Sequence, residues 1–331
     1  MTIKAALLAA GLALGLASPS AAADKFKIGY DIYFGGNSWS VQLYKEFQAE
    51  AERQSAKVDV TYTESELKAD KQVANIEDLI TKGVDAIILT PISPTAVIPV
   101  LKKAEAKHIK VVLLASKIKS QDYDALVTVD DVDFGKAGAE WLAKTLSGKG
   151  KIIALNGIAG ISASDDRWAG AEEVFKKYPG IKVVSAIEAS WDYAKAKVAV
   201  SNLLAANPEI DGIWSQGGGM TLGAIDAFQA AQRPLVPMTA EDNNGYLKRW
   251  AALKAAGFKS IAPSKPTWLG SEALIITLKL LNKQSVPKDT ILPVPMITED
   301  TLAKFVRADL SDSFWANTRL SDDQVRAAFK D

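Results

Sequence analysis

The sequence has no cysteine and a single histidine among its 331 residues. Without cysteine the chain forms no disulfide, and no lipid-modified cysteine can hold its N-terminus to a membrane. The histidine, His108, lies in the charged stretch KKAEAKHIK, where we expect a surface residue. A His-based catalytic triad and a soft-metal site therefore lack their residues, and we expect no enzyme activity, no metal and no cofactor.

An excess of charge of either sign is also missing. Lys plus Arg and Asp plus Glu each number 39, and neither a charge block nor a low-complexity linker interrupts the chain. This balance offers no attraction to nucleic acid or to an anionic membrane surface. Hydrophobic residues make up 48% of the chain, enough for one large core or two smaller ones, and two lobes are our default expectation.

The chain opens with an apolar run that is too short to span a membrane. Residues 1–23 carry Lys4 as their only charge, an apolar run over residues 5–17 and small residues at 20–23. At about 1.5 Å per residue the run reaches about 20 Å, against a hydrocarbon core of about 30 Å. The pattern is typical of a cleavable secretory signal peptide. We expect a soluble mature chain that begins near Asp24, outside the cytoplasm, with one excess negative charge.

After this leader, short β-rich runs alternate with longer helical patterns such as KADKQVANIEDLITKG. The runs predict strands at residues 26–30, 58–63, 86–89, 111–114, 126–129, 151–155, 182–187, 212–215, 235–239 and 259–262. Continuous apolar strands between amphipathic helices indicate parallel sheets covered on both faces. The expected fold class is α/β, with two doubly wound parallel-sheet lobes joined by a multi-strand hinge.

The alternation changes near Asp130, where two strand-like runs follow each other with no full helix between them. We expect a first lobe of residues 24–129 and 263–293, and a second lobe of residues 130–262 and 294–331 that includes a C-terminal extension. Several crossings between the lobes predict a hinge, with the cleft between them as the ligand site. We assign Asp130 and Asp131 to this hinge.

Ligands of open parallel sheets lie outside the carboxyl ends of the strands, so the strand-to-helix junctions are the candidate site segments. They are residues 33–39, 90–95, 115–117, 130–133, 156–168, 189–192, 215–220, 240–245 and 262–268.

Four of these junctions carry motifs of one family. They are NGIAGISASDDRWAGAEEVF, NSW, ASWDYAKA and TAEDNNG. With them the chain resembles a periplasmic solute-binding protein of the ribose-binding type, the capture component of a sugar ABC transporter, up to about residue 292. The resemblance implies two α/β lobes that close on one sugar, a periplasmic location, an ABC transporter permease as partner and a monomer.

Carried over position by position, the resemblance places Asn37 and Trp39 against the sugar from the first lobe, and Trp191 and Asp242 from the second. The chain also departs from the family pattern. Ala115-Ser116 replace an Asp-Arg pair, Asp165 replaces an Arg with Arg167 two residues later, and Gly217-Gly218 replace Asn-Asp. These departures argue against ribose itself as the ligand.

The chemistry of a neutral sugar fits these residue types. Its apolar face is covered by aromatic rings, and Trp39 and Trp191 would form two opposing jaws. The alternative for Trp39 is packing on its own helix. The hydroxyl rim is held by paired hydrogen bonds, with Asp165, Glu241 and Asp242 as acceptors and Arg167 as donor.

Helix capping is the alternative for the acidic and amide residues, and we prefer it for Asp166, Asp192, Asn243 and Asn244. Ser116, Gln216 and Gly217 complete the candidate ligand-binding set. The Gly217–Gly219 cluster lacks the spacing and the lysine of a P-loop, so it indicates close approach of the backbone to a ligand, or room for Trp168 or Trp214.

The sequence thus predicts capture of a small neutral sugar or sugar alcohol for a transporter. The alternative is an extracytoplasmic sensor or signal-furanose receptor that acts through a membrane partner. A repressor core would need an N-terminal DNA-binding segment where the leader stands. In the tail DLSDSFWANTRLSDDQVRAAFKD, Phe314 and Trp315 are expected to strap the chain to a lobe ahead of a capped helix from Ser321, with a permease-docking surface as the alternative.

Overall fold

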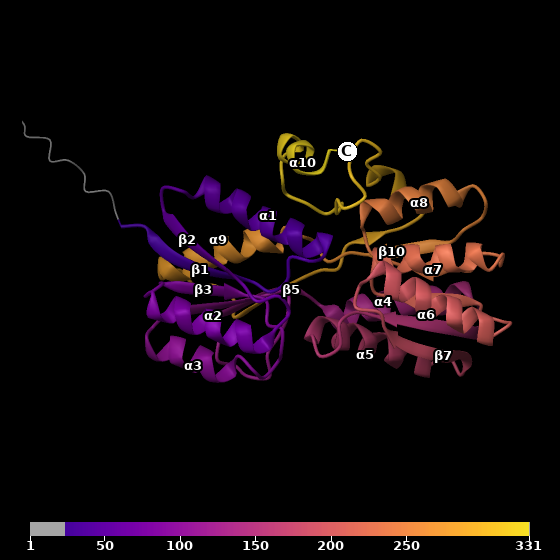
Figure 1. The fold of residues 1–331 in the computed structure, drawn as a ribbon, viewed down its shortest axis with the longest axis horizontal. Coiled ribbons are helices and arrows are strands. Elements are labelled where there is room, and N and C mark those ends of the chain that lie inside the picture. Colours follow the sequence, from indigo (N-terminus) through magenta and orange to yellow (C-terminus); the bar gives the residue numbers. More distant parts are fainter. Residues whose placement is uncertain (1–23, 331) are drawn as a thin grey trace, which may run out of the picture.

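The computed structural model describes residues 24–330, so the expected leader lies outside the described residues. Two six-stranded sheets lie side by side along the long axis of the molecule, each flanked by helices (Figure 1). The predicted α/β class with two parallel-sheet lobes is confirmed. None of the described helices is long and apolar enough to cross a bilayer.

The first sheet has the strand order β11-β5-β4-β3-β1-β2, and all of its pairs are parallel. Its strands are β1 (Phe26–Ile32), β2 (Val58–Glu64), β3 (Ala86–Leu89), β4 (Lys110–Leu114), β5 (Ala125–Val129) and β11 (Asp289–Leu292). Its helices are α1 (Ser38–Arg53), α2 (Ala69–Thr81), α3 (Ile98–Ala106) and α9 (Leu269–Leu281).

Strand β3 shows why this sheet needs helices on both faces. All four of its side chains are apolar and fully buried. Successive side chains of a strand point to opposite faces, so Ile88 packs with the cluster of α1 and α9, whereas Ile87 packs with that of α2 and α3.

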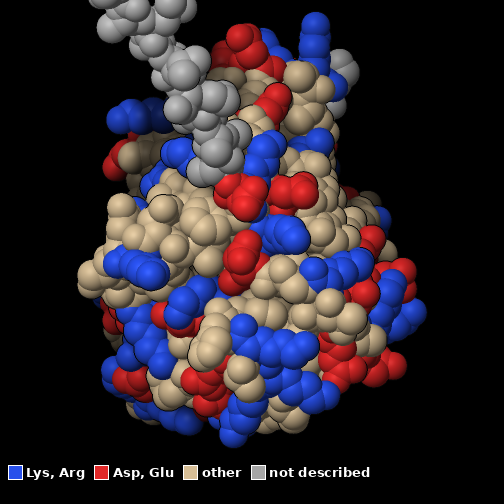
Figure 2. All heavy atoms as spheres, turned by 90° about the vertical axis from the view of Figure 1, so that its left-hand side faces the viewer, with Lys and Arg blue, Asp and Glu red and all other residues tan. Residues whose placement is uncertain are grey.

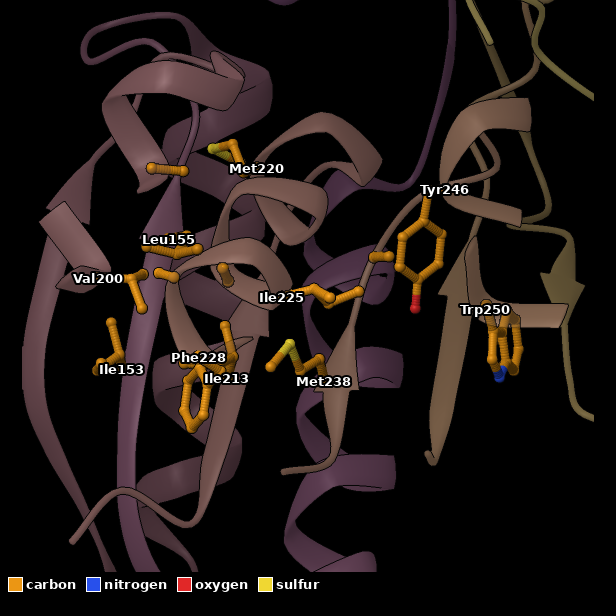
Figure 3. Packing of buried hydrophobic residues seen from close by; sticks show 14 of the residues in the cluster. Ile153, Leu155, Val200, Ile213, Met220, Ile225, Phe228, Met238, Tyr246 and Trp250 are labelled. Carbon is orange, nitrogen blue, oxygen red and sulfur yellow. The ribbon is translucent and has the colours of Figure 1, made fainter. Parts of the chain in front are cut away.

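The second sheet has the order β12-β10-β9-β8-β6-β7, parallel except for the antiparallel pair β10–β12. Its strands are β6 (Lys149–Asn156), β7 (Gly180–Glu188), β8 (Gly212–Ser215), β9 (Met238–Thr239), β10 (Ser260–Pro263) and β12 (Met296–Ile297). Its helices are α4 (Asp131–Thr145), α5 (Ser162–Lys176), α6 (Tyr193–Ala206), α7 (Gly218–Ala230) and α8 (Asn244–Lys254). Figure 3 shows one of its two cores, in which Ile153 and Ile213 of the sheet pack with Val200 and Phe228 of the helices.

Each predicted strand corresponds to a strand of the structure. One strand is shorter than predicted, and two further strands were not predicted. β9 covers only Met238–Thr239 of the expected 235–239. Proline has no N–H for the ladder, and Pro237 precedes the strand. β11 and β12 lie where the sequence predicted no strand.

The chain changes sheet between β5 and β6, between β10 and β11, and between β11 and β12; β10 ends at Pro263, one residue beyond the expected boundary. The domain boundaries at these positions stay a prediction. After β12 the chain forms a tail of residues 298–330 with η1 (Leu302–Lys304) and α10 (Asp322–Phe329). The tail lies across the top of the molecule in Figure 1, between α1 and α8. Its residues Leu310, Phe314, Val325 and Phe329 form a small core of their own.

Surface charges show the balance expected from the composition. On the end of the molecule that faces the viewer in Figure 2, basic and acidic side chains lie interspersed among neutral ones. Exposed ion pairs include Lys82, the C-cap of α2, with Asp78 and, on α5, Lys176 with Glu172.

Candidate functional site

A cavity of about 110 Å³ lies between the two lobes, where the carboxyl ends of both sheets face each other. Its wall takes residues from the junctions after β1, β3, β4, β6, β7, β8, β9 and β10 and from the tail. Pockets for drug-sized ligands typically measure about 300–1,000 Å³. This smaller cavity suits a compact ligand.

Three indole rings line the cavity: Trp39 from the first lobe, Trp191 from the second and Trp315 from the tail. Trp39 is half-buried, and its Nε1 donates to the Lys265 carbonyl oxygen at 2.8 Å. Trp315 is buried, and its Nε1 donates to Ser38 Oγ at 3.0 Å. With their N–H groups held by the protein, both rings are fixed against the cavity.

The backbone around Trp191 is strained. Ser190 and Trp191 have φ values of 59° and 55°, in the left-handed region that non-glycine residues rarely adopt. Gly217 makes room for the ring, because a Cβ at this position would lie 2.9 Å from Trp191 Cδ1. The space that the sequence assigned to Trp168 or Trp214 is therefore occupied by Trp191. Trp168 and Trp214 instead pack on each other, with ring centroids 5.5 Å apart.

The charged residues of the wall are Arg167, Glu241 and Lys265, and all three are buried. Arg167 donates from Nη2 to Glu241 Oε1 at 3.2 Å and from Nε to Asp131 Oδ1 at 3.0 Å. Its guanidinium lies over the Phe134 ring, 3.6 Å from the centroid. The close approach of α4 to α5 permits these contacts, since a Cβ on Gly135 would lie only 1.8 Å from the Arg167 carbonyl oxygen.

Lys265 completes this network from the segment that returns to the first lobe. Its Nζ donates to Asp131 Oδ2 at 2.7 Å and to the Ala115 carbonyl oxygen at 2.6 Å. Burial lowers the pKa of Lys265, against the raising effect of Asp131. Burial also raises the pKa of Glu241 to about 7, because desolvation outweighs the attraction of Arg167. With both carboxylates ionised, the two cations and the two anions of this network balance, and each cation of the wall has an anionic partner within the protein.

Two smaller predicted residues also reach the wall. Asn37 is the N-cap of α1, where its Oδ1 accepts from the Ser40 amide at 2.8 Å, and it lines the cavity as well. Ser116, after β4, is buried and also lines the cavity. Capping and contact with the cavity are therefore compatible, and the same holds for Asn243, the N-cap of α8.

Three predicted residues lie off the wall, contrary to our expectation. Asp165 is exposed in the first turn of α5. The buried Gln216 donates from Nε2 to Asn156 Oδ1 at 3.1 Å and to the Ser164 carbonyl oxygen at 3.0 Å. Asp242 is buried and accepts from Asn317 of the tail, so it fastens the tail instead of facing the cavity.

Several wall residues were not among the candidates. Tyr33, Thr90, Ala115 and Lys265 lie in the predicted junction segments, so the topology could have found them. Trp315 lies in none of these segments. Asp131, assigned to the hinge by the sequence, is the buried partner of two wall cations.

The two lobes touch at the rim of the cavity. Lys117, after β4, donates from its backbone N to Ser162 Oγ at 2.7 Å and from Nζ to Asp166 Oδ2 at 3.1 Å. Beside them, Tyr33 of the first lobe packs with Ile161 and Ala163 of the second. We refer to Lys117, Ser162 and Asp166 as the lip, because they join the two lobes.

The wall is suited to holding a neutral polar molecule. It combines apolar rings with amide, hydroxyl and paired ionic groups. Among the described residues there is no group of three or more His, Cys, Asp or Glu that could hold a metal ion. The exposed His108 lies in the turn after α3, at φ 59°, and is not part of the wall.

Comparison with known proteins agrees with this arrangement. Residues 28–285 match the profile of a family described as a periplasmic binding protein domain. The xylitol-binding protein of Mycolicibacterium smegmatis is 29% identical over 246 residues, which cover 74% of this chain and 70% of that protein. The ribose import binding protein of Bacillus subtilis is 26% identical over 285 residues, which cover 86% and 91%.

A solved ABC transporter solute-binding protein of Mycobacterium smegmatis, with bound glycerol, has a TM-score of 0.79 and 25% identity, and the match covers 88% of this chain and 100% of that one. The fold and the profile thus agree over most of the chain, and as its sequence motifs predicted, the chain belongs to the periplasmic binding protein family.

Proposed function

We propose that this protein captures a small neutral sugar or sugar alcohol in the cavity between its lobes and delivers it to the permease of an ABC transporter. The observation that carries the proposal is the wall itself. Indole rings from both lobes face a cavity whose charged groups, Arg167, Glu241 and Lys265, are already paired within the protein.

The pairing of charges is the argument for a neutral ligand. An anionic ligand such as a sugar phosphate needs cations that are not already neutralised, and a bidentate Arg is the usual choice. Arg167 already donates to Asp131, Glu241 and the Gln216 carbonyl oxygen. A neutral ligand leaves this network intact and meets the rings with its C–H face.

The relatives support the same ligand class. The names of the two curated relatives specify xylitol and ribose, and the solved relative holds glycerol, all of them polyhydroxylated and uncharged. These relatives do not favour the sensor alternative. By the same analogy we propose a binding protein without catalytic activity, which works as a monomer with no nucleic acid partner and no membrane insertion.

The proposed cellular location of the protein follows from the leader that the sequence predicts. We propose that residues 1–23 direct the chain out of the cytoplasm and are removed, so that the protein works in the periplasm without a lipid anchor. The absence of cysteine from the sequence supports the second part.

A thermal-shift screen tests the ligand class. The panel contains pentoses, hexoses, furanoses and alditols, with sugar phosphates and aldonates as charged controls. A ligand at 100 times its dissociation constant adds about 2.7 kcal/mol to the free energy of unfolding, which is readily measured as a higher melting temperature. We expect stabilisation by one or a few neutral compounds. Stabilisation by the charged controls alone would contradict the proposal.

A further inference from the structure

The tail touches both lobes at the cavity. Trp315 is bound to α1 of the first lobe by two backbone hydrogen bonds: its N donates to Gln42 Oε1 at 2.8 Å, and its carbonyl oxygen accepts from Gln42 Nε2 at 2.9 Å. Gln42 is fully buried, which makes both bonds costly to break without replacement.

The residues next to Trp315 are bound to the second lobe. Trp315 forms an antiparallel bridge with Asn243, and the Ala316 amide donates to the Asp242 carbonyl oxygen at 3.1 Å. The amide and the side chain of Asn317 both donate to Asp242 Oδ2 at 3.0 Å. We call residues 314–319 the strap, since they are fastened to the first lobe on one side and to the second on the other.

The strap is fastened at a third place by a buried acid. Glu46 of α1 is fully buried, and its Oε1 accepts from the Arg319 amide at 3.0 Å and from the Thr318 hydroxyl. Burial raises the pKa of this carboxyl. Buried polar groups are usually hydrogen-bonded, and two of the three residues that donate to Glu46 Oε1, Thr318 and Arg319, belong to the strap.

The strap also contributes a side chain to the wall. Trp315 lines the cavity together with Trp39 and Trp191, and it lies beyond residue 285, where the family match ends. We propose that the strap completes the ligand site: Trp315 is a third aromatic wall that contacts the C–H face of a bound sugar or polyol, and ligand binding and docking of the strap on both lobes stabilise each other. This inference rests on the proposed function.

The mutual stabilisation follows from linkage. A ligand held by Trp315 favours the docked strap, and the docked strap favours the ligand by the same factor. Opening of the cleft would separate α1 from the loop before α8, and the strap cannot keep its bonds to both. Ligand should therefore slow the opening of the strap.

Binding measurements on variants test whether Trp315 contacts the ligand. The reference ligand is the neutral compound of the screen that binds the wild type most tightly, measured by calorimetry. We expect Trp315→Ala to weaken binding at least tenfold and Trp315→Phe to weaken it less, because a phenyl ring keeps part of the apolar face. Gln42→Ala, which is not on the wall, should also weaken binding by releasing the strap. Trp141→Ala, a half-buried tryptophan of α4 off the wall, is the matched control and should bind as the wild type does.

Hydrogen exchange tests the strap without relying on the ligand. In unliganded protein, Gln42→Ala should speed exchange of the Trp315 amide, with exchange in β6 unchanged. In wild type, the reference ligand should slow exchange at Trp315 and Asn317. If folded Trp315→Ala binds the reference ligand within twofold of the wild type, Trp315 does not contact the ligand. If the Trp315 amide exchanges equally fast in Gln42→Ala and in the wild type, Gln42 does not fasten the strap. If no neutral compound binds the wild type, the proposed function fails, and the exchange of Gln42→Ala still decides whether the strap exists.

Discussion

At the scale of single residues, Trp39 occupies a position that is compatible with both of the roles that its sequence left open. Its ring packs against the core of the first lobe, and its N–H is held by the Lys265 carbonyl oxygen. The same ring lines the cavity. A half-buried aromatic ring that is fixed at one edge and free on one face is a rigid platform for an apolar surface.

This dual position leads to a prediction for Trp39→Ala. We expect at least tenfold weaker binding of the neutral ligand, because aromatic contact contributes about 1 kcal/mol beyond the area it buries. Wild-type tryptophan fluorescence should change on binding. Trp191→Ala should behave in the same way, and Trp168→Ala, off the wall, serves as control. Removal of a core tryptophan costs about 3–5 kcal/mol of stability, so a large drop in melting temperature with unchanged affinity would place Trp39 in the core alone.

The sequence predicted which strand-to-helix junctions contribute to the cavity wall. It did not show which of two nearby polar residues within a junction faces the cavity. Asp165 and Arg167 lie two residues apart on α5, about 200° around the helix axis, so only one can face the cavity. The structure turns Arg167 inward, toward Asp131. Glu241 and Asp242 are likewise neighbours that point to different sides, one to the cavity and one to the tail. Periodicity alone does not say which member of such a pair is buried.

At the scale of elements, the lip connects the N-terminal part of α5 with the segment after β4. Its ion pair, Lys117 with Asp166, is partly exposed, and such pairs contribute about 0–1 kcal/mol. Its second bond, from the Lys117 amide to Ser162, is independent of the lysine side chain. The lip can thus tune closure without determining it.

We therefore expect Lys117→Ala to speed ligand release by about two- to fivefold at low salt, measured by stopped-flow fluorescence. High salt should remove most of the difference, because it screens exposed charges. Lys103→Ala is the matched control, since Lys103 pairs with Glu77 within the first lobe. An equal effect in the control, or unchanged release in Lys117→Ala, would show that the lip does not hold the cleft closed.

The elements themselves were largely predictable, because buried parallel strands are short apolar runs with nothing polar to obscure them. The exceptions have a physical cause. β11 has partly exposed residues at the edge of its sheet, and β12 is only two residues long. Neither carries enough apolar pattern to be distinguished from a linker. What places them is pairing with β5 and β10, which the sequence does not display.

At the scale of the whole molecule, the two lobes, the crossings between them and the tail form one continuous unit around the cavity. The number of lobes and the position of the cleft followed from the alternation of strands and helices. The path of the tail did not, because polar backbone contacts such as those of Gln42 and Glu46 leave no periodic signal.

The export proposal gives a prediction for the whole chain. Expressed in a Gram-negative host, the protein should be recovered from the periplasm with a mass that corresponds to a chain beginning at or near Asp24. The small residues at 20–23 offer the expected cleavage site. Mass spectrometry of the intact product checks this, and a product that keeps Met1 or stays with the membrane would contradict it.

The position of Trp315 in the chain has a consequence for the order of synthesis. Every other residue of the cavity wall precedes it, and the nearest of them is Lys265. A growing chain that has formed both sheets but has not yet released its last segment lacks one ring of the wall and the bonds that join the two lobes over it. Such a chain folds before its ligand site is complete, so we expect it to hold a sugar at least tenfold more weakly than the finished protein, as for Trp315→Ala.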